Sequence, residues 1–259
     1  MAKWLWWWLG CCLALGAGAA ERPTQPLSLS LESFLWEEFL DGERLLYERG
    51  ARLAAGVERD NLGRAWPGLV FLARARFYGG RVAYQGRSQS ADGTTYPLAS
   101  HTDYLGGGAR LLLGQRLGYL SEGPALDLYL GANFGLWLRN IAGGVDAGGR
   151  AAAGYQELYR QWSLLAGLGL ARPQPHLSWF GAGLSLPVWV REWVSLAGQE
   201  LRPRGAPGFW VNLRMRLSSR TTLALEAVVE RWRASPVVGG VFQPESRSQR
   251  LAMGLVWAL

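Results

Sequence analysis

Two histidines occur in the chain, and one of them stands near an acid in a pattern that suits hydrolysis. His101 and Asp103 are separated by one residue, so in an extended strand their side chains point to the same face. A histidine near a carboxylate can serve as the general base of a hydrolase. Ser100 directly precedes His101 and therefore points to the opposite face, which argues against a Ser–His dyad. His101 and Asp103 are thus candidates for catalysis, but the sequence predicts no complete catalytic set.

Arginine carries nearly all of the positive charge, because Lys3 is the only lysine among 27 basic residues. Against 20 acidic residues this gives a net charge of +7 and a pI near 9.8. Such a balance can indicate a nucleic-acid partner. Here the arginines are scattered at strand spacing instead of gathering in one stripe, so no nucleic acid is expected as a partner.

Motifs for cofactors and metals are missing from the sequence. It contains no P-loop, dinucleotide fingerprint, calcium loop or His-rich metal spacing. Cys11 and Cys12 are the only cysteines, and both precede Ala20. We therefore predict no cofactor, no metal site and, once that segment is removed, no disulfide.

The first residues have the layout of a secretory signal peptide. Lys3 supplies a positive charge, an apolar run covers residues 4–15, and small residues at 17–19 form a cleavage site. The apolar run is short for a helix that spans a bilayer permanently. We predict residues 1–20 as a cleaved signal peptide and residues 21–259 as one mature domain, with an N-terminal membrane anchor as the alternative.

The elements that must position the charged residues alternate with a period of two, as β-strands do. The clearest example runs from Leu126 to Arg139. One face of this segment is wholly apolar and consists of Leu126, Leu128, Leu130, Ala132, Phe134, Leu136 and Leu138. The other face begins at Asp127 and mixes polar residues, glycine and aromatic rings. A helix would scatter these two sets around its circumference, so the segment predicts a strand with a lipid-facing stripe.

About ten such strands follow one another along the chain. They are expected at residues 29–40, 44–57, 67–86, 101–116, 125–140, 156–171, 176–190, 207–218, 221–234 and 247–259. The connections then alternate between short periplasmic turns and longer outer loops, as in bacterial barrels. Residues 87–100 and 141–154 read as flexible outer loops.

The fold class predicted from this pattern is an all-β, antiparallel, up-and-down transmembrane β-barrel. Glycine is abundant, with 35 residues, aromatic residues make up 12% and the mean hydropathy is 0.00. No apolar run of 18 residues follows the signal peptide, so a membrane protein with this sequence must be a closed barrel. Gly79 and Gly80 in the long third segment could mark a bulge or a turn, which leaves eight or twelve strands as alternatives.

The last predicted strand resembles the C-terminal strand that the barrel assembly machinery of bacteria recognises. Its apolar face consists of Leu251, Met253, Leu255, Trp257 and Leu259. The usual terminal residue of that signal is aromatic, and here it is a leucine. The resemblance implies a generic small outer-membrane β-barrel protein of a Gram-negative-type bacterium, without a specific family. It also implies the assembly machinery, outer-membrane lipids and lipopolysaccharide as partners.

Some outer-membrane barrels are enzymes, among them the omptin-like proteases. The pair His101 and Asp103 resembles the omptin Asp/His pair in reverse order, without an adjacent Asp-x-Asp partner. His176 follows Pro175 in a predicted periplasmic turn, away from any lipid A substrate. A hydrolase acting on lipid or peptide is therefore kept as a functional alternative, and an enzyme is not favoured.

Charged side chains alternate with the lipid-facing residues and are expected inside the barrel. They are Glu48, Arg52, Arg74, Arg76, Arg110, Asp127, Arg139, Arg214, Arg216, Glu226 and Glu230. A ten-strand barrel has little interior room, so these arginines and carboxylates should pair. Glu48 is expected to meet Arg74 and Arg76 on the neighbouring strand. Arg49 interrupts an outward apolar set and is expected near the lipid headgroups.

The sequence thus predicts an integral outer-membrane protein with a structural or surface-interaction role and a largely filled, arginine-rich lumen. Because arginine is in surplus, a narrow pore that favours anions is an alternative, with a small solute as its cargo.

Overall fold

A computed structural model describes residues 26–60, 68–89, 94–119, 124–171 and 177–257 of the chain. The predicted signal peptide at residues 1–20 lies outside these ranges, as do His176 and Leu259. No helix in the described ranges is long and apolar enough to cross a membrane.

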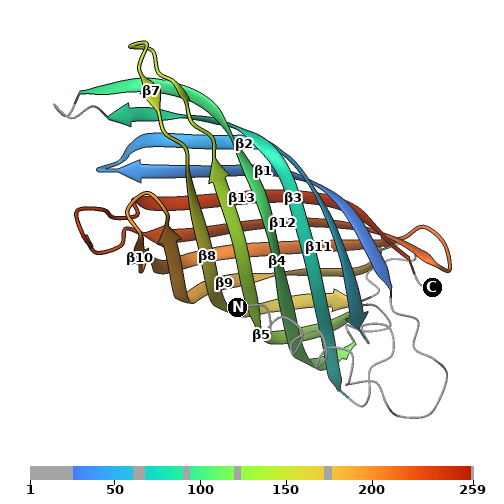
Figure 1. The fold of residues 1–259 in the computed structure, drawn as a ribbon. Coiled ribbons are helices and arrows are strands. Elements are labelled where there is room, and N and C mark those ends of the chain that lie inside the picture. Colours follow the sequence, from blue (N-terminus) through green and yellow to red (C-terminus); the bar gives the residue numbers. More distant parts are fainter. Residues whose placement is uncertain (1–25, 61–67, 90–93, 120–123, 172–176, 258–259) are drawn as a thin grey trace, which may run out of the picture.

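Ten long antiparallel strands form the wall of the molecule (Figure 1). They are β1 (Leu27–Leu40), β2 (Glu43–Asp60), β3 (Leu69–Gln89), β4 (Thr95–Tyr119), β5 (Ala125–Ile141), β8 (Tyr155–Ala171), β9 (Leu177–Val194), β11 (Arg204–Arg216), β12 (Thr221–Arg233) and β13 (Glu245–Trp257). Three short strands lie in the connections, namely β6 (Gly144–Val145), β7 (Ala151–Ala152) and β10 (Gln199–Leu201).

The sheet closes on itself because its first and last strands pair. β1 and β13 are antiparallel, from Leu27 opposite Trp257 to Phe39 opposite Glu245. Every other long strand pairs with its neighbours along the chain, including β8 with β9. Closure satisfies the backbone N–H and C=O groups that an open edge would leave unpaired. The prediction of an all-β, antiparallel barrel of about ten strands is confirmed, and eight or twelve strands are excluded.

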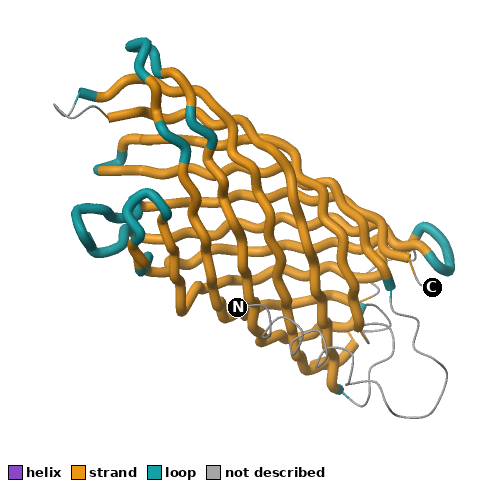
Figure 2. Tube along the Cα trace, viewed as in Figure 1, coloured by secondary structure: helices purple, strands orange, loops and turns teal. Residues whose placement is uncertain are grey.

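The two ends of the barrel differ. One end, called here the loop end, carries the turn between β1 and β2, the β6–β7 hairpin and the β9–β10 hairpin (Figure 1). The other, called the turn end, holds the start of β1, the end of β13 and the tight turn at residues 217–220 (Figure 2). Apart from the two-residue turn between β1 and β2, the connections wholly described at the loop end are longer than the turn at residues 217–220, in agreement with the asymmetry expected from the sequence.

The prediction of a flexible loop at residues 87–100 is wrong in extent. β3 and β4 continue pairing as far as Gln89 opposite Thr95, so most of this segment is strand. A neighbouring connection supports the extension, since the backbone N–H of Ala147 donates to the carbonyl of Pro97 at 2.9 Å. Residues 141–154 are likewise not a featureless loop, because β6 and β7 pair within them.

Gly79 and Gly80 form neither a turn nor a bulge. β3 runs through both residues, and its register against β2 is unchanged from Gly79 opposite Leu53 to Ala83 opposite Arg49. Gly80 faces the lumen, where a Cβ atom would lie 2.8 Å from the carbonyl oxygen of Ala51. The glycine therefore allows a close approach of two strands at this level.

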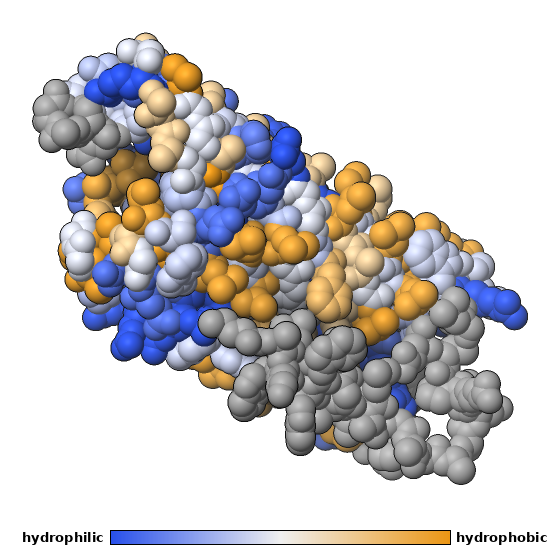
Figure 3. Space-filling view, viewed as in Figure 1, coloured by the Kyte–Doolittle hydropathy of each residue, from blue (hydrophilic) through white to orange (hydrophobic). Residues whose placement is uncertain are grey.

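The two faces of the wall have opposite character. Outward residues such as Leu130 and Leu105 are 66% and 67% exposed, whereas inward Val70 and Leu112 are 0% and 1% exposed. Hydrophobic residues spread over the middle of the wall, and strongly hydrophilic residues gather toward its ends (Figure 3). The alternation of the sequence thus becomes an apolar exterior and a packed interior.

Candidate functional site

The interior of the barrel is filled by side chains in three zones along its axis. Successive inward positions of β3 pass through all three, from Leu72 through Arg74 and Arg76 to Tyr78. Leu72 belongs to an apolar cluster near the turn end, together with Val70, Leu112, Ala125, Tyr129, Leu165, Ala171, Trp179, Trp210 and Val228. Tyr78 belongs to a cluster near the loop end, together with Phe34, Trp36, Leu46, Ala54, Val82, Tyr84, Leu98, Tyr104, Trp137, Ile141, Tyr159, Val190 and Trp232. We call these the turn-side layer and the loop-side layer.

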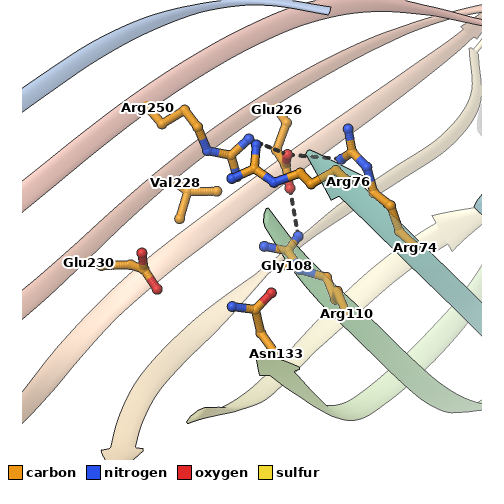
Figure 4. A pocket seen from close by; sticks show the side chains of 9 residues that line it. All are labelled: Arg74, Arg76, Gly108, Arg110, Asn133, Glu226, Val228, Glu230 and Arg250. Carbon is orange, nitrogen blue, oxygen red and sulfur yellow. Dashed lines mark hydrogen bonds and ion pairs between the residues drawn. The ribbon is translucent and has the colours of Figure 1, made fainter. Parts of the chain in front are cut away.

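Two carboxylates organise the zone between the layers. Glu226 on β12 accepts from Arg74 at 3.0 Å, from Arg110 at 2.6 Å and from Arg250 at 2.9 Å (Figure 4). Arg74 and Arg110 reach it from β3 and β4, across the lumen from β12. Glu226 is therefore a hub that ties opposite walls of the barrel together.

Glu32 on β1 is the second carboxylate of this zone. It accepts from Arg52 at 2.8 Å and from Arg250 at 3.3 Å, and it also pairs with Arg76. Arg250 thus links Glu32 to Glu226. We call Glu32, Glu226 and their arginines the middle network.

The middle network continues toward the turn end through Glu58. This carboxylate pairs with Arg74 at 3.3 Å and also with Arg214, which reaches Asp60 at 3.2 Å. A separate pair joins Arg116 to Asp127 at 2.7 Å. The Tyr129 hydroxyl donates to Asp127 at 2.9 Å, which connects this pair to the turn-side layer.

Arginine surrounds a small polar cavity in the middle network. The cavity measures about 50 Å³ and is lined by Arg74, Arg76, Arg110 and Arg250 with Asn133 and Glu230 (Figure 4). That volume holds about three water molecules. The charged zone therefore contains only a cavity of water size.

The charge balance is reversed nearer the loop end, in what we call the Arg139 cluster. Arg139 is completely buried and pairs with Glu38 at 3.1 Å, with Glu48 at 3.0 Å and with Glu157. Glu192 lies in the same region, is completely buried and forms no ion pair with the described residues. One guanidinium here serves several carboxylates.

Aromatic rings close the lumen around the Arg139 cluster. The Trp137 ring stacks on Tyr159 at a centroid distance of 4.9 Å, and Trp36 packs against Trp232 at 5.1 Å. The guanidinium of Arg139 lies 4.5 Å from the centroid of Trp36, a cation–π contact. Trp36, Trp232 and Arg139 are each no more than 2% exposed. The loop-side layer thus consists of buried aromatic rings packed around the ion pairs of Arg139.

The residues expected inside the barrel lie in the lumen, except Arg216, which shares the parity of Arg214 but stands at the strand end. Arg216 is exposed at the end of β11 and forms no ion pair with the described residues, so its expected place in the network is wrong. Glu230 accepts a hydrogen bond from the Gln161 amide at 2.7 Å. The expected contact of Glu48 with Arg74 and Arg76 is also wrong, because Glu48 lies opposite Tyr84.

Several members of the networks were missed from the sequence. They are Glu32, Glu38, Glu58, Glu157, Glu192 and Arg250. Glu32 has the parity opposite to the outward Leu29 and Leu31, and Arg250 directly precedes outward Leu251, so the alternation carried a signal for both. Glu192 follows a bulge in β9 that shifts the parity, and alternation alone points it to the wrong face.

His101 and Asp103 lie on the outer face of β4. Asp103 is held by Arg81 of β3, with Nε 2.7 Å from Oδ1 and a terminal nitrogen 3.0 Å from Oδ2. Arg81 is 64% exposed, so this ion pair is superficial. The carboxylate has an arginine partner and no serine aligned with His101, and this geometry gives no support to a hydrolase. No group of three or more His, Cys, Asp or Glu side chains in the described ranges could hold a metal ion.

A cleft opens at the loop end, where β2 and β3 stop pairing beyond Tyr47 and Gln85. Its volume is about 490 Å³, and Val145 and Asp146 of the β6–β7 hairpin form one side. Arg44 and Arg87 contribute positive charge to the lining. The cleft is much larger than the cavity of about 50 Å³ in the middle network, and it has room for a ligand group.

No family model matches the chain, and no curated protein matches it. Among solved structures, an outer membrane channel from Pseudomonas putida F1 aligns over 94% of this chain and 98% of its own, with 10% identity and a TM-score of 0.40. The beta domain of the Bordetella autotransporter BrkA aligns over 92% and 100%, with 12% identity and a TM-score of 0.41. Neisserial surface protein A aligns over 90% and 97%, with 11% identity and a TM-score of 0.34. Similarity at this level concerns the strand architecture and assigns no role.

Proposed function

We propose that the chain is an integral outer-membrane barrel with a structural or surface-interaction role and a lumen that does not conduct. The observation that carries the proposal is the filled interior, in which the turn-side layer and the loop-side layer enclose the middle network. A closed barrel with an apolar exterior suits a bilayer, because it leaves no unpaired backbone in the lipid. The longer loop-end connections suit the cell surface, and the tight turns suit the periplasm.

The packing of the lumen supports a closed barrel over a pore. The cavity beside Glu226 measures about 50 Å³, and a second of about 50 Å³ lies between Arg52 and Trp232. Each is large enough for a few waters but for no hydrated solute. Any passage must also cross two layers of buried rings. The cleft of about 490 Å³ at the loop end is the place where a surface partner would bind.

Export and assembly belong to the same proposal. Residues 1–20 act as a cleaved signal peptide, and the alternate apolar residues from Leu251 to Leu259 address the chain to the barrel assembly machinery. Outer-membrane lipids and lipopolysaccharide surround the apolar wall. Mass spectrometry of the mature N-terminus from membrane fractions tests the cleavage.

Planar-bilayer recording of the refolded protein tests the filled lumen. Heat-modifiable migration on gels first establishes that the barrel has folded, and the wild type should then give no stable current steps. Removing one tryptophan from each layer, with Trp36→Ala and Trp210→Ala together, should produce steps because both layers lose a buried ring. The matched control is Trp193→Ala, since Trp193 faces outward and is 39% exposed. Stable steps from the wild type would contradict the proposal.

One observation favours the narrow anion-selective pore as a second candidate. Four arginines line the central cavity against two carboxylates, Glu226 and Glu230, so any ion that enters meets an excess of positive charge. This candidate predicts wild-type steps with a reversal potential that favours chloride. The same recording therefore decides between the two functions.

A further inference from the structure

Arginines face each other directly across neighbouring strands at several places in this barrel. Like charges in opposed positions destabilise a sheet, so each such pair needs a counter-charge. Inside the lumen, Arg74 lies opposite Arg110, and Glu226 binds both at 3.0 and 2.6 Å. On the outer wall, Arg160 lies opposite Arg191, and Glu200 binds both at 2.7 and 3.4 Å. Both pairs have a carboxylate between them.

Two further pairs on the outer wall have no such bridge. Arg204 of β11 lies opposite Arg233 of β12, and Arg231 of β12 lies opposite Arg247 of β13. Arg231 and Arg233 share the outward face of β12. Ala206 of β11 lies directly opposite Arg231, so Arg204 lies diagonally across from Arg231. Arg231 is thus surrounded by three other arginines. We call these four residues the rim arginines.

The acidic residues near the rim arginines leave most of the positive charge of these arginines unbalanced. Glu37 binds Arg247, with Nε at 3.0 Å, and it is shared with Arg44 at 3.3 Å. Glu245 is exposed at the start of β13 and forms no ion pair with the described residues. Arg204, Arg231 and Arg233 are exposed, and their side chains form no hydrogen bond or ion pair with the part of the chain that the structure describes.

The rim arginines lie at the border of the apolar wall that faces the loop end. Arg231 is the next outward residue after Val229 on β12, and Phe209 and Leu251 occupy the apolar wall on the two neighbouring strands. All four are toward the loop end. Under the proposed membrane placement, this border is the level at which the headgroups of the outer leaflet begin.

We infer that the rim arginines bind a phosphorylated headgroup of an outer-leaflet lipid, with one phosphate centred on Arg231. This inference rests on the proposed outer-membrane function and names a lipid contact for it. Guanidinium groups bind phosphate through paired hydrogen bonds, and they lose less hydration than an ammonium group would. A phosphate between the opposed pairs supplies the counter-charge that Glu226 and Glu200 supply elsewhere. The lipid chains lie along the apolar wall below.

Lipid binding by the refolded full barrel in detergent tests the inference. Three probes are titrated separately: lipid A with two phosphates, the same lipid with its phosphates removed, and inorganic phosphate. The temperature of thermal unfolding, measured by heat-modifiable migration, should rise with phosphorylated lipid A and with neither of the other two probes. The double variant Arg231→Gln with Arg233→Gln should weaken that binding by roughly tenfold or more, because it removes two charge-assisted contacts.

The bridged pair provides the matched control. Arg160→Gln should leave lipid A binding close to the wild type, since Glu200 already neutralises that pair. Equal loss in both variants, or no loss in the rim variant, would overturn the site. Equal stabilisation by inorganic phosphate or by the dephosphorylated lipid would overturn the assignment to a phosphorylated lipid. Failure of the proposed function would be seen in a separate measurement. The folded wild-type protein would then either fail to insert into bilayers or give stable current steps.

Discussion

The middle network and the Arg139 cluster solve the same packing problem with opposite charge. In the middle network, Glu226 and Glu32 each accept from three arginines, and Arg250 is common to both. In the Arg139 cluster, one arginine serves three carboxylates. The lumen is therefore positive at its centre and negative beneath the loops. In each zone the hub is a residue whose charge is opposite in sign to that of most of its neighbours. Loss of a hub should therefore lower the free energy of unfolding by more than loss of any one of its partners.

The two hubs differ in whether their partners have a second ion pair when the hub is lost. Arg74 and Arg250 keep Glu58 and Glu32 as second partners if Glu226 is lost. The carboxylates of the Arg139 cluster share a single cation in the described lumen, although Trp36 also donates to Glu38 at 2.8 Å and Thr102 to Glu48 at 2.7 Å. The comparison thus predicts that Arg139 is the more sensitive hub.

Replacement of Arg139 should have the largest effect. In Arg139→Met the buried carboxylates lose their cation, and loss of one partner of a buried ion pair typically costs about 3–5 kcal/mol. Urea unfolding of the barrel in lipid vesicles measures the change. Adding Glu157→Gln should recover part of the loss by removing one unpaired charge. Arg216→Ala is the control, because Arg216 is exposed and should change stability by less than about 0.5 kcal/mol. A fully stable Arg139→Met barrel would show that the cluster does not depend on its hub.

Replacement of Glu226 should have a smaller effect. Glu226→Gln removes the shared charge but keeps an acceptor oxygen, and only Arg110 is left with no other ion pair in the described residues. We expect a loss of about 2 kcal/mol, below the full cost of orphaning a buried charge. The same unfolding assay measures it, with Glu230→Gln as a control that retains the acceptor for Gln161. A loss larger than that of Arg139→Met would reverse the ranking of the two hubs.

The strand pattern of the two regions could be predicted from the sequence, because side-chain parity follows directly from a period of two. Leu126 to Arg139 alternates without interruption, and the structure places Asp127 and Arg139 in the lumen as the parity requires. The choice of partner could not be predicted in this way. Arg110 meets Glu226 across the barrel, a contact that exists only after the sheet has closed.

The errors in the predicted elements have tertiary causes. Residues 87–100 have the polar and glycine composition of a loop, yet the β6–β7 hairpin stabilises their pairing, with the guanidinium of Arg150 lying 3.8 Å from the Tyr96 ring centroid. The alternation predicts a strand that ends at Val190, which leaves Glu192 in a loop. A bulge beside Trp189 changes the parity and turns Glu192 inward, and no periodic pattern contains that information.

Asp146 provides the smallest and most local contrast with the lumen, because its partners are mainly uncharged donors. This carboxylate of the β6–β7 hairpin accepts from Ser88 at 2.5 Å and from the backbone N–H groups of Gly148 and Arg150 at 2.8 and 3.0 Å. The Ser88 hydroxyl and the backbone N–H groups, with the nearby Arg150 charge, hold the pKa of Asp146 below its usual value of 3.8. A lowered acid pKa adds stability that is complete above pH 3.8 and is lost as the pH falls through the lowered value. The protection factors of the hairpin amides, which correct for the intrinsic pH dependence of exchange, should therefore be constant near neutral pH and fall only in acid. Asp146→Asn should remove this acid dependence while leaving lumen stability intact.

Two other outcomes would contradict this account of Asp146. If acid lowers the protection of the hairpin amides in the variant as much as in the wild type, a different group holds the hairpin. If the variant loses global stability, the hairpin and the Arg139 cluster beneath it unfold together.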